Sequence, residues 1–171
     1  MLGEHFFWIT SRAAGIAALL AASAAVALGL WMSSGRKGPD VRTAHEALSL
    51  GTLVALGVHA LALLGDGYLK PSLADVTIPF VSGYETLWTT TGIIAGWLLV
   101  ILGLSYYVRG RIGPARWRKL HRFTALAWLL GLVHSLGEGT DAGAAWFLIA
   151  TLMVALPAGA LLVRRLTPEV A

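Results

Sequence analysis

The stretch RTAHEALSLGTLVALGVHALALLG, residues 42–65, is an apolar run interrupted by two histidines, His45 and His59. As a helix, a run of this length is sufficient to cross a hydrocarbon core about 30 Å thick. The imidazoles are fourteen positions apart, which is two heptads, so both lie on nearly one face of the helix and about 21 Å from each other. A polar side chain inside a membrane span is costly and usually faces the interior of a bundle, which makes both histidines candidates for function.

The rest of the chain has the composition of a membrane protein. Of its 171 residues, 57% are hydrophobic and only 13% are charged, and the mean hydropathy is +0.72. A soluble domain carries about 25% charged residues. The apolar residues form five blocks, and a helical span needs about 20 residues. We predict an all-α membrane protein with a single transmembrane domain over residues 1–171, a bundle of about five helices with spans at about 6–32, 43–65, 84–108, 120–137 and 142–163.

Basic residues are concentrated in one set of loops. Of the 13 Lys and Arg, 11 lie in three segments: Arg36, Lys37 and Arg42; Arg109, Arg111, Arg116, Arg118, Lys119 and Arg122; Arg164 and Arg165. The other loops carry the acidic residues Glu4, Asp66, Asp75, Glu85, Glu138 and Asp141. The positive-inside rule therefore predicts a multi-pass protein of the cell membrane, with the amino terminus outside and the carboxyl terminus in the cytoplasm. The basic pI of about 9.9 follows this sidedness and does not indicate nucleic-acid binding.

A second pair of histidines lies in the predicted span 120–137. His121 and His134 are thirteen residues apart, about 20 Å along a helix. The spans 43–65 and 120–137 are separated by two crossings and run in the same direction, so His45 shares a depth with His121, and His59 with His134. On a straight helix, thirteen residues leave His121 and His134 about 140° apart around the axis, so a tilt, a local distortion or a lateral offset of the two sites is required.

Four imidazoles at two matched depths predict two bis-histidine iron sites, stacked between the second and fourth spans. Haem fits this arrangement, because its iron takes one axial ligand from each side and its macrocycle fills an apolar cleft. The sequence has no cysteine, which excludes thiolate metal sites and iron–sulfur clusters. Small residues near the histidines either leave room for a porphyrin or simply allow close helix packing: Ser49, Gly51, Ala55, Gly57, Ala125, Ala127 and Gly131.

The two histidine spacings resemble those of the ferric reductase-like transmembrane domain, which ferric reductases and NADPH oxidases share. Four further segments are similar to bacterial members of that family: SRAAGIAALL at 11–20, IPFVSGY at 78–84, RWRKLHR at 116–122 and HSLGEGTD at 134–141. The resemblance implies a short bacterial form of a dihaem b-type cytochrome, which carries electrons from the cytoplasmic to the outer face. It implies two haem b groups, the inner with iron ligands His45 and His121 and the outer with iron ligands His59 and His134.

The sequence contains no GxGxxG fingerprint and ends soon after the fifth predicted span. We therefore expect no flavin or nicotinamide site in this chain, and a separate electron donor, either a flavoprotein or a quinol. The chain would then be an oxidoreductase component of ferric-reductase type.

Two arginines are candidates for contacts with haem propionates. Arg12 lies about two turns inside the first span, where it either pairs with an outer-haem propionate or extends to the interface. Arg122, beside His121, either serves the inner propionates or only belongs to the basic cluster. His5 lies outside the two matched depths and is expected at the interface.

Local patterns make two further structural predictions. TAHE at 43–46 fits the capping box, so we expect the second helix to begin with Thr43 as its N-cap. The long connection 66–83 carries several apolar residues, and we expect it to pack as a cap over the outer face.

Three functions remain open at this stage. The first is electron transfer to a small external acceptor such as ferric iron or dioxygen. The second is a quinol-linked haem subunit that feeds a periplasmic or extracellular partner protein. The third is a non-redox membrane protein whose histidines bind a metal ion or relay protons, which is disfavoured because no Asp or Glu lies deep in a predicted span. Membrane lipid is an expected partner in all three.

Overall fold

A computed structural model describes residues 5–35 and 38–167. Within these ranges all regular secondary structure is helical, with no strand. Four helical stretches are long and apolar enough to cross a membrane: α1 (Phe6–Ser33), α2 (Pro39–Leu64), α4 (Thr86–Leu104) with its continuation through η1 (Ser105–Val108) and α5 (Arg109–Ile112), and α8 (Ala145–Leu166). The predicted all-α membrane architecture is confirmed, with four helical stretches of spanning length among the described residues where five were predicted. Glu4, Arg36 and Lys37, which belong to the predicted charge pattern, lie outside the described residues.

The predicted fourth span is not one long helix. It consists of α6 (Pro114–His121) and α7 (Thr124–Gly137), and α7 has 14 residues, about 21 Å, which is shorter than the hydrocarbon core. Between them the backbone tightens: Phe123 N–H donates to Leu120 O at 3.0 Å, and Ala125 N–H donates to Arg122 O at 3.2 Å, both to the third residue back. This break is the local distortion that the spacing of His121 and His134 requires.

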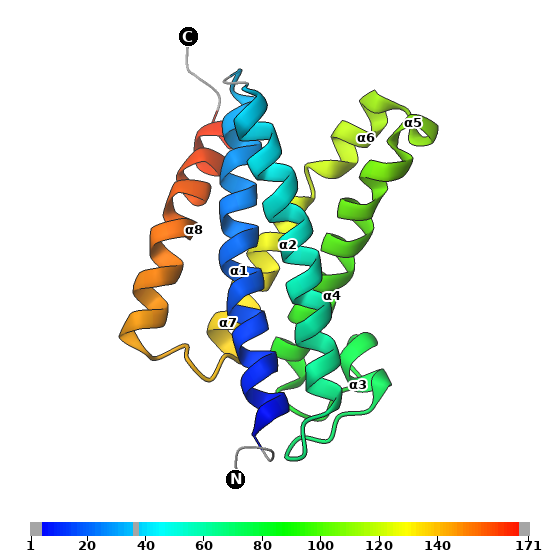
Figure 1. Ribbon diagram of the computed structural model, residues 1–171, viewed down its shortest axis with the longest axis vertical. Helices are drawn as coiled ribbons and strands as arrows, with labels where there is room; N and C mark the ends of the chain where they lie inside the picture. The colour runs from blue at the N-terminus through cyan, green and yellow to red at the C-terminus, as the bar shows by residue number, and fades with distance from the viewer. Residues whose placement is uncertain (1–4, 36–37, 168–171) are drawn as a thin grey trace.

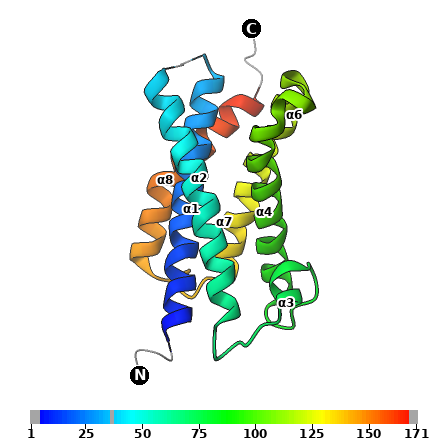
Figure 2. The ribbon, with the colours of Figure 1, turned by 45° about the vertical axis from the view of Figure 1, so that its right-hand side comes forward.

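The helices form a bundle around α1 (Figure 1). Helix α1 packs along α2 on one side and along α8 on the other, and α4 packs along α7. The backbones of α2 and α7, which carry three of the four histidines between them, scarcely approach each other. As the molecule stands in Figure 1, we call the end at which α1 begins the lower end and the opposite end the upper end. Helix α2 runs from the upper to the lower end, and the α6–α7 pair runs in the same direction (Figures 1 and 2).

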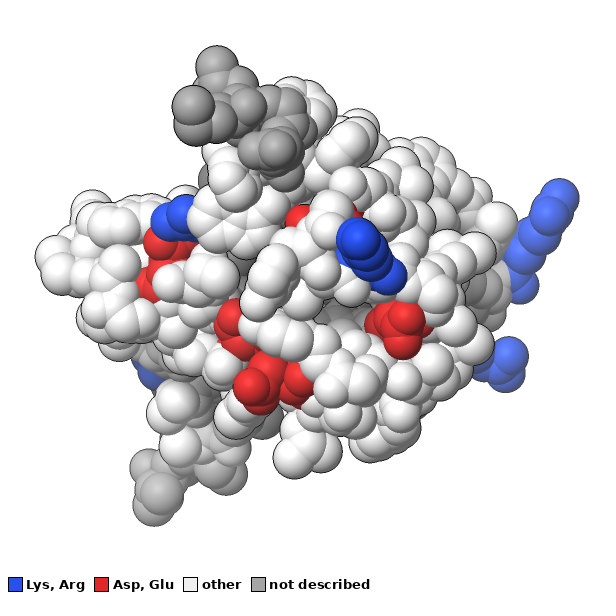
Figure 3. All heavy atoms as spheres, turned by 90° about the horizontal axis from the view of Figure 1, so that it is seen from below, with Lys and Arg blue, Asp and Glu red and all other residues white. Residues whose placement is uncertain are grey.

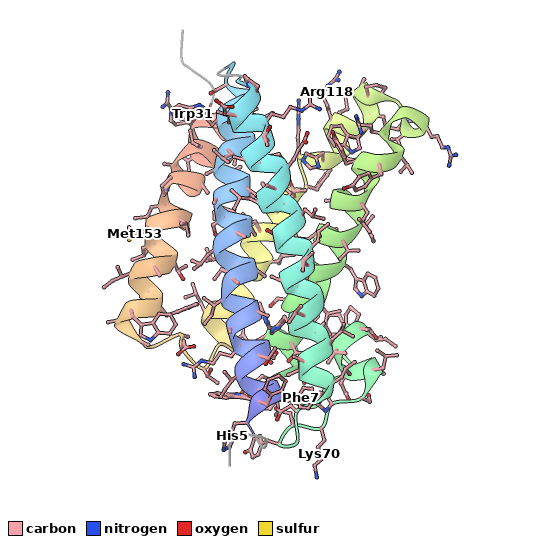
Figure 4. The ribbon with its side chains drawn as sticks, in the orientation of Figure 1. His5, Phe7, Trp31, Lys70, Arg118 and Met153 are labelled. Atoms are coloured by element: carbon pink, nitrogen blue, oxygen red, sulfur yellow. The ribbon has the colours of Figure 1, made fainter. Side chains whose placement is uncertain are left out.

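The densest packing is where α1, α7 and α8 meet. Trp128 of α7 is only 2% exposed and lies against Ala22, Ala155 and Ala158, whose small side chains let the helices approach closely. Its indole Nε1–H donates to Ser23 Oγ at 2.9 Å, and the Ser23 hydroxyl donates to its own helix backbone. Side chains on the far side of α8, such as Met153, point outward (Figure 4), as expected for a lipid-facing surface.

Helix α2 begins earlier than predicted, so the proposed capping box is wrong. Gly38 is the N-cap and Pro39 occupies the first turn, where a proline is favoured because its missing N–H would be unpaired anyway. Thr43 Oγ1 donates to Pro39 O at 3.0 Å inside the helix, and Glu46 pairs with Arg42 at 2.9 Å.

The connection 66–83 contains a short helix, α3 (Leu73–Thr77), which does have a capping box. Ser72 and Asp75 bond each other there, and the hydrogen bonds from Ser72 hold the pKa of the exposed Asp75 carboxyl below its usual value.

The connection does not simply lie over the lower face. It folds back beside α4 (Figure 2), where Phe80 N–H donates to Thr90 Oγ1 at 2.9 Å and Trp97 Nε1–H donates to Thr77 O at 2.8 Å. Trp97 is eleven residues into α4, about 16 Å along the helix. The segment therefore lines the side of the bundle near its lower end.

Replacement of Trp128 by Ala is expected to lower the free energy of unfolding by about 3–5 kcal/mol, because it opens a cavity among α1, α7 and α8. Thermal or denaturant unfolding in detergent micelles, followed by far-UV circular dichroism, measures the change. Trp146→Ala is the matched control, since Trp146 is 52% exposed at the start of α8 and is expected to have a much smaller effect. Equal losses in the two variants would contradict this description of the core.

Candidate functional site

The four histidines meet in two pairs across the gap between α2 and the α6–α7 pair. In the upper pair, the ring centroids of His45 and His121 are 6.3 Å apart and the ring planes are 87° apart. In the lower pair, the centroids of His59 and His134 are 6.5 Å apart and the planes are 72° apart. The structure thus brings together the side chains that the sequence placed at matched depths.

Three of these rings are oriented by a backbone carbonyl of a neighbouring helix. His45 Nδ1 lies 2.9 Å from Ala25 O, His59 Nδ1 lies 2.8 Å from Ser11 O, and His134 Nδ1 lies 2.9 Å from Trp88 O. A carbonyl oxygen can only accept, so Nδ1 must carry the proton in each ring. Nε2 is then left with a free lone pair, which is the state of a histidine that binds a metal.

A glycine accompanies each of these three hydrogen bonds, four residues after the accepting carbonyl. A Cβ at Gly15 would lie 3.0 Å from His59 Nδ1, one at Gly29 would lie 3.2 Å from His45 Cε1, and one at Gly92 would lie 2.6 Å from His134 Nδ1. In a helix the carbonyl of residue i already bonds the N–H of residue i+4. Without a side chain at i+4, an imidazole can approach and use the second lone pair of that carbonyl.

The fourth ring is held differently. His121 Nδ1 is buried and forms no hydrogen bond of strict geometry among the described residues, and the backbone of Leu102 is the polar group that interacts with the ring. The ring instead stacks on Trp117, with centroids 4.7 Å apart and planes 23° apart, and Trp117 Nε1–H donates to Ser105 Oγ at 3.0 Å. His121 therefore differs from the other three rings in its stacked contact with Trp117.

A cavity of about 540 Å³ surrounds the lower pair, which is within the range of about 300–1,000 Å³ typical of cofactor and ligand sites. Apolar side chains of α1, α2 and α4, such as Leu19, Leu56 and Ile93, form most of its walls. Of the small residues singled out from the sequence, Gly57, Ala127 and Gly131 line it, whereas Ser49, Gly51, Ala55 and Ala125 do not. His45 and His121 are not part of its lining.

The rim of the cavity is acidic. Asp66, Glu138 and Asp141 line it near the lower end, and Figure 3 shows acidic side chains on that face around a hollow. Glu138 is the residue that the sequence analysis missed: its Oε2 lies 3.2 Å from His134 Nδ1, and the spacing of four residues on one helix is the signal that would have found it.

Arg12 has a protein partner in this rim. Its guanidinium binds both carboxylate oxygens of Asp141, which is only 6% exposed, and lies over the Trp8 ring at 5.0 Å from the centroid. The other predicted arginine, Arg122, is exposed at the turn between α6 and α7. His5 is exposed at the lower end, away from both histidine pairs (Figure 4).

The ring separations in both histidine pairs match those of two imidazoles that share one iron. Two imidazoles that bind one iron through Nε2, at about 2 Å each, have ring centroids about 6 Å apart, close to the separations found. A bare metal ion needs at least three converging side chains, and among the described residues no three His, Asp or Glu converge in this way. Opposed imidazole pairs, with Nδ1 protonated in His45, His59 and His134, are a donor set that suits a haem iron.

The chain matches the family described as Ferric reductase like transmembrane component over residues 8–132, which is most of its 171 residues. The matched segment includes His45, His59 and His121, and His134 lies two residues beyond it. No curated protein and no solved structure matches the chain. With α1, α2, α4 and most of α7 inside the match, the chain belongs to the ferric reductase-like transmembrane component family.

Proposed function

We propose that this chain is a dihaem b-type cytochrome domain, which transfers electrons across the membrane to an acceptor on the outer face. Members of its family generally bind haem, and the transmembrane domain suggests electron transfer. The observation that carries the proposal is the pair of matched imidazole sites, with centroid separations of 6.3 and 6.5 Å on helices whose backbones stay apart.

In this proposal the upper pair faces the cytoplasm and the lower pair faces outward. The exposed basic residues of α5 and α6, such as Arg111, Arg116 and Arg118, lie at the upper end, and the acidic rim lies at the lower end. This distribution supports an outside amino terminus and a cytoplasmic carboxyl terminus. His45 and His121 would hold the inner haem, and His59 and His134, which line the cavity, the outer one.

Haem supplies a one-electron redox couple when it is bound. The protein residues do the rest: the histidines hold the group in place, and the carbonyls of Ser11, Ala25 and Trp88 fix the orientation of three rings. The largely apolar walls of the cavity would surround the macrocycle at the lower site. About 20 Å along the bundle separates the two pairs, so together they divide the membrane into shorter electron-transfer steps.

The donor and the acceptor lie outside the chain in this proposal. A flavoprotein or a quinol would deliver electrons at the upper end, and either a small oxidant or a partner protein would accept them at the lower end. Arg12, in the cavity wall next to Asp141, would assist the outer haem, and Arg122, next to His121 in the sequence, would assist the inner haem.

Removal of one ligand from each pair tests the two sites separately. His59→Ala is expected to remove one of two haems, and His45→Ala the other, because each site loses one axial ligand while the other pair stays intact. Haem per chain is measured by the pyridine haemochrome method on protein with an unchanged far-UV spectrum. His5→Ala is the control and should keep both haems, since His5 contacts neither pair. Loss of both haems from every single variant would contradict two independent sites.

Gly92→Ala is expected to remove the outer haem without loss of a ligand. The new Cβ would lie 2.6 Å from His134 Nδ1, so the ring must leave its carbonyl partner. Gly51→Ala is the matched control, because nothing lies within 4 Å of a Cβ at that position. The haem content and the absorption spectrum report the effect. Full haem content in Gly92→Ala would show that contact with Gly92 does not position His134.

A further inference from the structure

The Nδ1 atoms of the four histidines have different surroundings. Backbone carbonyls serve His45 and His59, with the Ser11 hydroxyl also close to His59, and His121 Nδ1 forms no hydrogen bond of strict geometry among the described residues. His134 alone has a carboxylate at this position, because Glu138 Oε2 lies 3.2 Å from its Nδ1.

Glu138 is held in place for this contact. Its Oε1 lies 3.0 Å from Thr89 Oγ1, whose single hydroxyl proton is shared between this carboxylate and Tyr84 O at 2.8 Å, so α4 contacts the carboxylate beside α7. The side chain is only 18% exposed, and the buried Oε2 lies beside His134 Nδ1, the polar atom that the structure places against it. A buried carboxylate oxygen is costly unless a donor or a positive charge lies beside it.

We propose that Glu138 lowers the reduction potential of the outer haem by acting on its ligand His134; this inference rests on the function proposed above. The oxidised iron carries one more positive charge than the reduced iron, and its axial imidazole shares that charge. A carboxylate beside the ring stabilises the oxidised form more than the reduced form, and it does so strongly where water is excluded. Glu138 is therefore a positioning and tuning residue and not a ligand.

Other charges near the outer site do not replace this contact. Arg12 neutralises Asp141 in a bidentate ion pair. Asp66 Oδ1 accepts a hydrogen bond from the Tyr68 N–H at 3.0 Å. No carboxylate is described next to the inner ligands in the same way: Glu46, one residue from His45, is paired with Arg42. The effect of Glu138 is thus confined to the outer haem.

The test is a potentiometric titration of Glu138→Gln at one fixed pH, with the purified protein holding both haems. The outer component is the one absent from His59→Ala. We expect its midpoint potential to rise by at least a tenfold shift in the one-electron equilibrium, about 59 mV, and the inner midpoint to stay unchanged. Asp66→Asn is the matched control: it removes one negative charge from the same cavity without touching His134, and its shift should be clearly smaller.

Two results would overturn the inference while leaving the proposed function intact: both haems bound with an unshifted outer potential, or equal shifts in Glu138→Gln and Asp66→Asn. A wild-type protein without haem would instead remove the proposed function. If Glu138→Gln loses the outer haem, Thr89→Val decides, because it releases the carboxylate and keeps its charge. The outer midpoint potential should then rise, but by less than about 59 mV, which corresponds to a tenfold shift in the one-electron equilibrium. An unchanged midpoint potential would refute the role of Glu138.

Discussion

The arrangement depends on one repeated interaction, a hydrogen bond from a histidine Nδ1–H to a helix carbonyl that a glycine leaves accessible. It occurs for His59 with Ser11 and Gly15, for His45 with Ala25 and Gly29, and for His134 with Trp88 and Gly92. Each bond fixes a ring against a supporting helix, so α1 supports the α2 histidines and α4 supports the α7 histidine. The rings are thereby held across the gap from one another, and α2 and α7 need no direct contact.

This interaction explains how a simple helical bundle supports the two α2 histidines in the same way at two depths. Gly15 and Gly29 are fourteen residues apart on α1, the same spacing as His45 and His59 on the antiparallel α2. The two supports are therefore copies at two depths. The α6–α7 pair cannot follow this repeat, because its histidines are thirteen residues apart; the break at Arg122 and Phe123 compensates, and Trp117 stacks on His121.

Much of this could be predicted from the sequence, because hydropathy determines the helices and the lipid-facing surface, and parallel spans determine which histidines meet. The fourteen-residue glycine repeat was also present in the sequence, but a glycine in a membrane helix is commonly explained by close packing, and only the Nδ1 contacts show its role. The helix break, the early start of α2 at Pro39 and the return of the 66–83 segment beside α4 depend on tertiary contacts that no local pattern specifies. Arg12 was expected to seek a propionate or the interface, and its bond to Asp141, 129 residues away, was not visible from either neighbourhood.

Basic and acidic side chains are separated along the same direction as the two histidine pairs, from the upper to the lower end of the bundle. Exposed arginines at the upper end and buried carboxylates around the lower cavity give the two sites different electrostatic surroundings on an otherwise repeated scaffold. In the proposed dihaem arrangement the ligands are the same at both depths, so differences between the two haems would come from Nδ1 partners and nearby charge. The most direct test of the four-histidine arrangement is the absorption spectrum of the purified wild-type protein, oxidised and dithionite-reduced, together with haem per chain. Two low-spin b-type haems per chain are the predicted result, and a correctly folded protein without haem, or with only one, would contradict it.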